Sequence, residues 1–488
     1  MSTECNRQAF DFQALARRNV TATFDGGAIT SDAGGLLLRE VEAKTGILRQ
    51  FAACFTDHRD PERIEHTVQE LVSQRVFGLT LGYEDLNDHD SLRHDPLFGL
   101  LVGKADPTGQ DRQRHADQGK ALAGKSTLNR LERTPVGANR KSRYKKIVAR
   151  HRDIESFFVT TFLNLHPEPL SEIVLDLDAT DDPIHGHQAG RFFNGYYDSY
   201  CYMPLYIFCG EHLLCAKLRP SNIDGAAGAQ KQLARIVAQI RQRPGWEKVR
   251  IIARGDSGFQ RELLMQWCEA NGVEYVFGLA KNNRLLRILG GEMHEAKLQF
   301  EATGQAARVF KDFTYQTKKS WIRERRVVGK AEHLDKGANP RFVVTSISAE
   351  EMDARKLYED FYCARGEMEN RIKEQQLYLF ADRTSCATMR ANQLRLWMSS
   401  MAYTLLQAFR QIGLRGTEME KSRCDTIRLR LLKLGALIQV TVRRVWISLS
   451  ENSPSQRLFA HVHKNLRRWT PRSLPIDVGD SPMIPDTG

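Results

Sequence analysis

The chain has 488 residues, with 71 Lys and Arg against 59 Asp and Glu, so its formal net charge is +12. This length allows roughly two to four domains, and 41% hydrophobic with 27% charged residues is a globular composition, which excludes fibrous and wholly disordered classes. The nine Cys form no C-x-x-C pair, and no apolar run reaches the ~18 residues of a membrane span, so we expect a reduced, cytoplasmic protein without zinc fingers or membrane contact.

The first third of the chain has helical periodicity from Ser31 to about Arg150, interrupted by polar loops. Its most basic window, Arg140–Arg152, contains seven Lys and Arg and no acid. This window is either a solvated helix face or a surface that contacts phosphates. We therefore expect residues 1–168 to be mostly helical, and both interpretations of the basic window stay open at this point.

Alternating strands and helices begin near Glu172. The expected elements, in chain order, are strands at Ile173–Asp178, Tyr200–Cys209 and His212–Leu218, a helix at Ala226–Arg243, a strand at Val249–Ala253, a helix at Gln260–Ala270 and a strand at Val273–Leu279. This order predicts an α/β core with parallel crossovers in its second half.

Residues 301–344 break that pattern with β-rich, strongly charged sequence, which we interpret as an inserted sheet. Helices return at Ser348–Asn370 and Arg390–Phe409. The following stretch, Lys421–Arg468, carries 11 Lys and Arg against two acids, Asp425 and Glu451. We expect this C-terminal stretch to be a second basic surface.

Acidic residues follow two of the expected strands. Strand alternation places Asp176 and Asp178 on one face, and like charges this close need a neutralising partner, for which a divalent cation is one candidate. Asp256 comes just after the next strand, in a Gly-Asp-Ser-Gly turn at the sheet edge where α/β proteins form sites.

A third acid, Glu369, lies on the expected helix around Tyr362. At 100° per residue, Glu369 shares one face with Tyr362, Arg365 and Lys373. Carboxylates from three segments are the hard oxygen ligands that Mg²⁺ or Mn²⁺ prefers. Surface ion pairing remains the alternative for the Arg and Glu, because these residue types pair commonly at i,i+4.

Several motifs resemble those of the DDE transposases of bacterial insertion sequences. Asp178-Ala179-Thr180 is similar to their first-strand D-x-T, and Gly255–Phe259 resembles their second-aspartate motif. Tyr362, Arg365 and Glu369 match the Y-x-x-R-x-x-x-E signature of the branch that excises elements through hairpin intermediates. Five segments of the chain are most similar to the insertion-sequence-1380 type: TSDAGG, YEDLNDHDSLRHDPLF, LDATDDP, ARGDSGF and YCARGEMENRIKEQ.

The resemblance implies a ribonuclease-H-like core, Mg²⁺ as cofactor with Mn²⁺ as a substitute, and DNA strand cleavage and strand transfer in cut-and-paste transposition by a two-metal mechanism. Asp178 rather than Asp176 then becomes the catalytic aspartate, with Asp256 and Glu369 completing the metal-binding triad. Asp176 would be a nearby supporting acid or an alternative ligand. The implied division of the chain is a helical region at 1–168, a core in two parts at 169–284 and 351–415, a β-rich insertion at 285–350 and a basic region at 416–488.

The resemblance also implies residues that contact DNA. Tyr362 and Arg365 would position phosphates, because guanidinium offers a fork matched to phosphate oxygens. The family has a Lys seven residues after the Glu, where this chain has Gln376, so Lys373 is the candidate replacement. Trp321, followed by Arg323, is the candidate for stacking on a base near the cut, and its alternative role is a core residue of the small sheet.

The expected partners are double-stranded DNA, at the terminal inverted repeats of an element and at its target, and a second copy of the chain on paired ends. When bound to DNA, the protein would associate with the nucleoid. Two other functions are kept: a ribonuclease-H-like nuclease without strand transfer, and a catalytically silent, domesticated DNA-binding protein. Joined DNA products would separate the first from a transposase.

Overall fold

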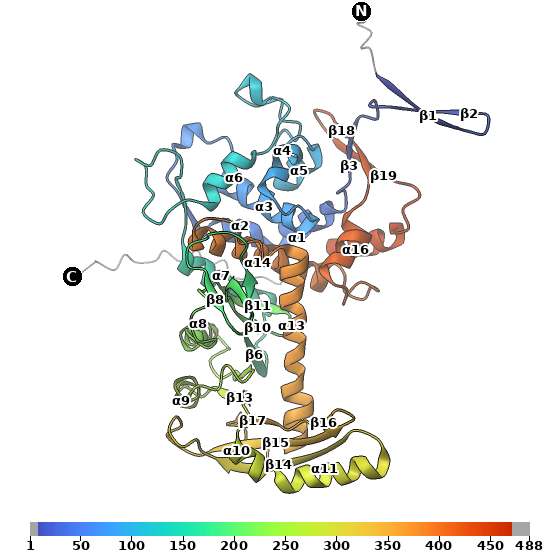
Figure 1. The fold of residues 1–488 in the computed structure, drawn as a ribbon. Coiled ribbons are helices and arrows are strands. Elements are labelled where there is room, and N and C mark those ends of the chain that lie inside the picture. The colour runs from blue at the N-terminus through green and yellow to red at the C-terminus, as the bar shows by residue number, and fades with distance from the viewer. Residues whose placement is uncertain (1–7, 471–488) are drawn as a thin grey trace, which may run out of the picture.

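A nine-stranded mixed sheet forms the lower half of the molecule, and a group of helices lies above one end of it (Figure 1). The computed structural model describes residues 8–470. Within that range, no helix combines the length and the apolar composition needed to cross a membrane. Along the sheet the strands are, in order, β11 (His212–Lys217), β10 (Leu205–Cys209), β6 (Glu172–Ala179), β12 (Arg250–Gly255), β13 (Glu274–Leu279), β17 (Arg341–Thr345), β15 (Arg325–Leu334) and β14 (Ala307–Tyr315), with β16 (Gly337–Ala338) beside β15.

Strands β6, β12 and β13 are parallel to one another, and β10 runs antiparallel to β6. The predicted parallel crossovers are therefore confirmed, with α8 (Ala229–Arg241) and α9 (Glu262–Ala270) as connecting helices. The single strand predicted at Tyr200–Cys209 is wrong, because Met203 and Pro204 divide it into two strands, β9 (Ser199–Tyr202) and β10. Proline cannot donate to a strand ladder, and the residues before it pair elsewhere as β9, between β7 (Asp182–Pro183) and β8 (Phe192–Asn194).

The two faces of β6 differ as its alternation predicts. Ile173, Leu175 and Leu177 are buried in the apolar core that α8 and α9 share with the sheet. Val174 faces the other way, in a smaller cluster with Leu357. The aspartates at alternate positions of β6 therefore look toward the helix that begins after β17.

The β-rich insertion does not form a sheet of its own, so that interpretation is wrong. Strand β17 pairs antiparallel with β13, from Val276 opposite Thr345 to Leu279 opposite Phe342, and so joins the insertion to the core ladder. Helices α10 (Asn283–Ile288) and α11 (Gly290–Thr303) come first in this segment, and α11 lies along β14 and β15 at the bottom of Figure 1. Hydrogen bonds thus continue across the core and the insertion without interruption.

The helix that carries Tyr362 and Glu369 is long but irregular, as the orange ribbon of Figure 1 shows. It is built from α12 (Ala354–Lys356), a π-helical stretch at Leu357–Tyr362, a 3₁₀ turn at Cys363–Arg365, α13 (Gly366–Lys373) and a second π-helical stretch at Glu374–Tyr378. The regular 100° step assumed from the sequence therefore fails on both sides of α13.

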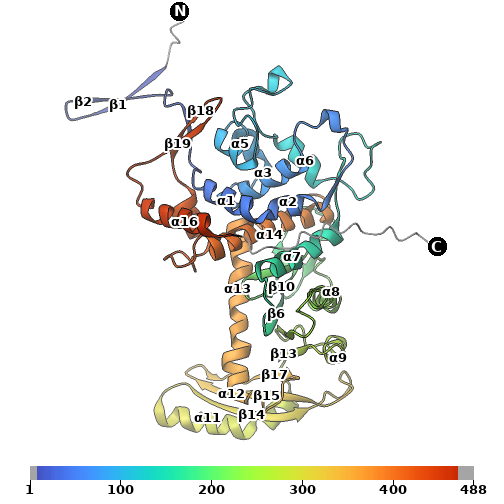
Figure 2. The same ribbon diagram turned by 180° about the vertical axis from the view of Figure 1, so that it is seen from behind.

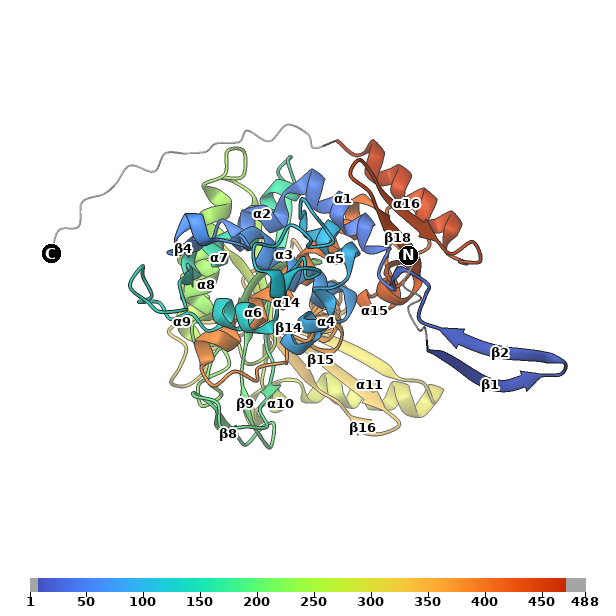
Figure 3. The ribbon, with the colours of Figure 1, turned by 90° about the horizontal axis from the view of Figure 1, so that it is seen from above.

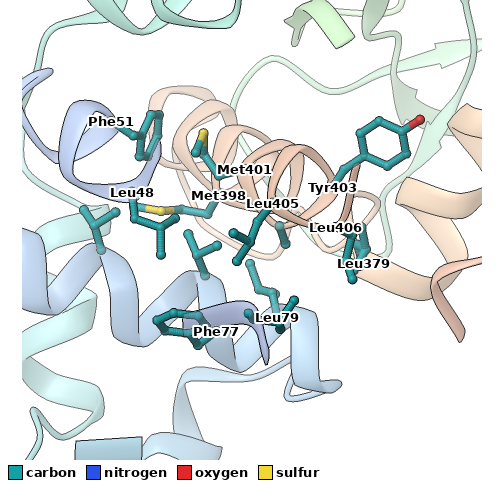
Figure 4. Packing of buried hydrophobic residues seen from close by; sticks show 14 of the residues in the cluster. Leu48, Phe51, Phe77, Leu79, Leu379, Met398, Met401, Tyr403, Leu405 and Leu406 are labelled. Atoms are coloured by element: carbon teal, nitrogen blue, oxygen red, sulfur yellow. The ribbon is translucent and has the colours of Figure 1, made fainter. Parts of the chain in front are cut away.

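The upper helices surround α14 (Met389–Ile412), which is buried along most of its length. Figure 4 shows Met398, Met401 and Leu405 of α14 packed against Phe51 and Phe77. The helices before the sheet are α1 (Gly35–Thr45), α2 (Ile47–Ala52), α3 (Val68–Leu81), α4 (His89–Leu92), α5 (Pro96–Val102), α6 (Lys125–Glu132) and α7 (His151–Leu165), with short strands β4 (Phe55–Asp57) and β5 (Ile147–Ala149) between them.

The C-terminal segment joins this same core, as Figure 2 shows from behind. Leu431 and Val462 are buried in the cluster that contains the helices of the first third of the chain. Its elements are α15 (Cys424–Ile427), β18 (Ala436–Val440), β19 (Val445–Leu449) and α16 (Gln456–Arg468), and β18 pairs with β3 (Ala28–Thr30). The hairpin of β1 (Ala9–Leu15) and β2 (Arg18–Thr23) projects away from the body (Figure 3).

Candidate active site

Asp178 lies at the carboxyl end of β6, where the neighbouring strand β12 has already ended opposite Leu177. One oxygen of its carboxylate accepts the N–H of Ala179 at 2.9 Å. Burial raises the pKa of Asp178 to about 7; Arg365 opposes this rise, and the charges of Asp256 and Glu369 add to it. The carboxyl group is thus held where ionisation is costly unless a further positive charge arrives.

Asp256 is fixed by the turn that follows β12. Its Oδ1 accepts the N–H of Gly258 at 2.8 Å, and its carbonyl accepts the N–H of Phe259 at 3.1 Å. The adjacent strand must come very close to this turn: a Cβ on Gly278 of β13 would lie 2.8 Å from the backbone nitrogen of Ser257 and 2.5 Å from the hydroxyl of Tyr362. Only a glycine at position 278 allows both the turn of Asp256 and the hydroxyl of Tyr362 to approach β13 this closely.

Arg365 lies among the acids as their shared counter-charge. Its Nη2 is 3.0 Å from Oε1 of Glu369, one helical turn away. Burial alone would lower the pKa of Arg365, but Asp178, Tyr362 and Glu369 together raise it above its ordinary value. The predicted i,i+4 ion pair therefore exists, and it also belongs to a cluster that reaches the ends of β6 and β12.

Asp176, which the sequence left as an alternative ligand, has a partner of its own. Arg254, its register neighbour on β12, holds it through Nε to Oδ1 at 2.6 Å and Nη2 to Oδ2 at 2.9 Å. The same guanidinium donates to the carbonyl of Phe361 and lies 5.1 Å from the centre of its ring. Asp176 and Arg254 thus fasten the irregular helix to the sheet just before Tyr362.

Other predicted contact residues lie apart from this cluster. Trp321 is only 5% exposed and packs edge-on against Tyr315 at 5.8 Å, beneath Arg325, so it is a core residue. Arg323 pairs with Glu269 at 2.6 Å. Lys373 is exposed on the rim of a cavity of about 460 Å³ that Arg371 and Arg423 also line.

Gln376, at the position of the expected Lys, contacts the loop after β6. Its Nε2 donates to the carbonyl of Asp181 at 3.0 Å. The side chain that departs from the family pattern therefore still holds the segment three residues beyond Asp178.

The acids fit a divalent cation in donor type. Carboxylate oxygens are hard ligands, and the repulsion that raises the pKa of Asp178 is what a cation would relieve. In residues 8–470, however, no three His, Cys, Asp or Glu side chains lie close enough to hold one metal ion. The three acids interact electrostatically, with Glu369 turned to Arg365.

A basic cavity of about 620 Å³ lies among the helices of the first third of the chain. Eight Lys and Arg line it against three acids; the cationic residues are Arg59, Arg63, Arg93, Arg112, Arg114, Lys120, Arg130 and Lys146. At its rim the ring of Tyr144, 56% exposed, has the guanidinium of Arg130 at 5.0 Å and that of Arg143 at 4.9 Å. The window Arg140–Arg152 is thus a loop, strand β5 and the start of α7 rather than one helix face.

Two of the acids thus lie at the ends of adjacent parallel strands, with a third on the irregular helix, at the edge of the sheet where α/β proteins form sites. The chain belongs to the family described as Transposase DDE domain group 1, whose family model matches residues 12–471. A comparison with curated proteins finds no match. Membership makes the chain a DDE transposase, an enzyme that cleaves and transfers DNA, and such enzymes generally use divalent metal ions.

Three residues of this site were absent from the sequence-based prediction. Gly278 carries a detectable signal, because glycine inside a strand marks a close approach of backbone. Arg254 and Tyr197 carry none, since their roles depend on strand register and on the path of a loop. Tyr197 donates its hydroxyl to the carbonyl of Ala179 at 3.3 Å.

Proposed function

We propose that this chain is a transposase of the insertion-sequence-1380 type that binds the ends of its element and moves it by cut-and-paste transposition. The observation that carries the proposal is the partly buried carboxyl group of Asp178, whose pKa the charges of Asp256 and Glu369 raise further while Arg365 supplies the nearby positive charge. A buried group whose pKa lies near neutrality at a strand end is typical of a catalytic centre.

Asp178, Asp256 and Glu369 are the proposed ligands of two Mg²⁺ ions, with Mn²⁺ as a substitute. When bound, such ions lower the pKa of water and stabilise the attacking and leaving oxygens of a phosphodiester. Glu369 must exchange its bond to Arg365 for this role, which frees the guanidinium to hold a phosphate oxygen. Tyr362, held against Gly278, would orient the same phosphate.

The strand order β11-β10-β6-β12-β13 supports a ribonuclease-H-like core, proposed in two parts at 169–284 and 351–415. The segment 285–350 is its β-rich insertion, with a helical DNA-binding region at 1–168 and a basic region at 416–488. We propose that two copies assemble on paired ends, in the cytoplasm and at the nucleoid when DNA is bound.

The basic cavity is the proposed contact with element DNA. Arg114 and Arg130 form no salt bridge within residues 8–470, so their charges are free to meet phosphates. Each phosphate contact releases counterions, so log K should fall linearly with log salt concentration, with a slope of about −0.9 per contact. Fluorescence anisotropy on a labelled duplex should give a slope about 2 smaller in magnitude for the Arg114→Ala/Arg130→Ala double variant. An unchanged slope would remove this cavity from the DNA-binding surface.

The decisive test is cleavage by Asp178→Ala, Asp256→Ala and Glu369→Ala on DNA carrying the sequences that flank the coding region. Each variant should bind this DNA as the unmodified protein does and lose about 10³-fold or more of its cleavage rate in Mg²⁺, because metal ligands act as a unit. Retained cleavage in one variant removes that residue from the site. Cleavage by the unmodified protein without joined products indicates a nuclease, and binding alone indicates a silent DNA-binding protein.

A further inference from the structure

An aromatic hairpin stands beside the acids and has no role in the function proposed so far. Strands β8 and β9 and their turn, residues 192–202, place five aromatic side chains within nine residues: Phe192, Phe193, Tyr196, Tyr197 and Tyr200. Four of them are exposed, and Tyr196 at the tip is 89% exposed. Figure 3 shows the two strands at the edge of the molecule. Phe193 and Tyr200 pair across the two strands with ring centroids 5.6 Å apart, which stabilises the hairpin, and Tyr196 lies beyond them at the tip. An exposed aromatic cluster of this kind is typical of a binding surface.

The hairpin is held in place by its own polar contacts. Asn194 donates through Nδ2 to the carbonyl of Ser221 at 2.9 Å, and the hydroxyl of Ser221 donates to the carbonyl of Phe192 at 2.9 Å. Within the turn, Oδ1 of Asn194 accepts the N–H of Tyr196 at 3.0 Å. The exposed ring is therefore presented from an anchored turn, which lowers the entropy cost of binding a flat ligand.

The tip of this hairpin lies next to the end of β6. Tyr197 donates to the carbonyl of Ala179, the residue after Asp178, at 3.3 Å. The rings of Tyr196 and Tyr197 meet edge to face, with centroids 4.9 Å apart. Burial raises the pKa of Tyr197 to about 12, and the charges of Asp181 and Asp178 add to this rise. A DNA strand with a phosphate at Asp178 would thus pass beside Tyr196.

A cation accompanies the rings. The guanidinium of Arg191 lies 4.8 Å from the centre of the Tyr200 ring. Exposed aromatic rings interleaved with Arg are the surface that single-stranded nucleic acid recognises, since every base has a flat face to stack. Trp321, for which stacking and a core role were both open from the sequence, is buried and offers no such face.

We infer that the hairpin at residues 192–202 stacks unpaired bases of the DNA strand whose phosphate lies at Asp178 and Asp256, with Tyr196 as the principal ring. This inference rests on the proposed function, because it needs DNA at the carboxylates. The ligand class is an unpaired nucleotide next to a duplex end. Intact base pairs would leave the rings unused, because their bases already stack on one another.

The test uses the full-length protein and two duplexes of the same sequence, one blunt and one ending in three unpaired nucleotides that include 2-aminopurine. Ca²⁺ replaces Mg²⁺, so that a cation can still join a phosphate to the carboxylates while its looser coordination geometry slows cleavage. The unmodified protein should bind the duplex with the unpaired end about tenfold more tightly than the blunt one, since stacking contributes a gain of this order per base. It should also quench the fluorescence of 2-aminopurine. Tyr196→Ala should lose both the preference and the quenching, whereas Tyr196→Phe should keep both.

Leu263→Ala is the matched control, because Leu263 is 71% exposed on α9 and has no part in the proposed DNA contacts. It should behave as the unmodified protein does. Equal affinity for the two duplexes, without quenching, overturns the inference and leaves the proposed function intact. Quenching that survives in Asp178→Ala while cleavage is lost supports both, and quenching without any cleavage by the unmodified protein supports the inference alone. Absence of binding to either duplex overturns both.

Discussion

Strand β6 carries an aspartate in its middle and another near its end, and the two differ in their ion-pair partners. Asp176 and Asp178 lie two residues apart on one face, yet only Asp176 has a guanidinium in direct contact. Strand β12 supplies Arg254 opposite Asp176 and then ends at Gly255, opposite Leu177. Asp178 therefore faces the turn of Asp256, and the positive charge near it is that of Arg365 on the irregular helix. A neighbouring strand that stops one residue early turns a structural acid into a candidate catalytic one.

Removing Arg254, the cation that pairs with Asp176 in the middle of β6, should have the largest effect on stability. Arg254→Met leaves Asp176 buried without its partner, which should lower the free energy of unfolding by about 3–5 kcal/mol. Denaturant unfolding followed by circular dichroism measures this change. In the Arg254→Met/Asp176→Leu double variant most of the loss should disappear, because no charge stays buried; equal instability of the two would mean that packing, not charge, is responsible.

Removing the charge of Asp178 at the end of β6 should instead raise the stability of the protein. The pKa of Asp178 is raised from 3.8 to about 7, so its contribution to stability is present below pH 4 and is lost as the pH rises through 7. Asp178→Asn should therefore be more stable than the unmodified protein at pH 8, by up to about 4 kcal/mol at 1.36 kcal/mol per pKa unit. Thermal unfolding in EDTA at pH 5 and pH 8 measures the difference, and a gain that does not grow with pH would contradict the assignment.

The smallest effect is expected at the loop just beyond β6. Gln376→Ala removes the bond to the carbonyl of Asp181 and should cost about 1 kcal/mol of stability, the usual net value of one hydrogen bond. Gln376→Lys should restore most of this loss if the ammonium reaches the same carbonyl. A Gln376→Ala protein with unchanged unfolding would show that the loop is held by other contacts.

Local patterns in the sequence predicted much of the α/β core. The alternation of β6 gave the correct apolar face, with Ile173, Leu175 and Leu177 inside, and the parallel crossovers followed from element order. The acids were found as separate motifs, and their catalytic roles stay predictions. Strand register decided the rest: the strand predicted at Val249–Ala253 ended before Arg254, so its pairing with Asp176 was invisible.

Two further failures have physical causes. A helical wheel assumes 3.6 residues per turn, and the π-helical stretches around α13 do not obey that period. Glu374, in the second of these stretches, is buried and pairs with Arg410 at 2.6 Å. Composition likewise cannot tell a buried ring from an exposed one. The sequence therefore offered Trp321 as the stacking candidate and not the exposed tyrosines of residues 196–200.

The pairing of β17 with β13 has a consequence for how this protein can be altered. Because that ladder crosses from the core into the insertion, excision of residues 285–350 would remove β17, the partner of β13 on the side away from β12, and leave a bare, apolar strand edge. Such an edge invites self-association rather than a smaller enzyme. The insertion is thus no detachable module, and shortened versions of this transposase need a replacement strand at that boundary.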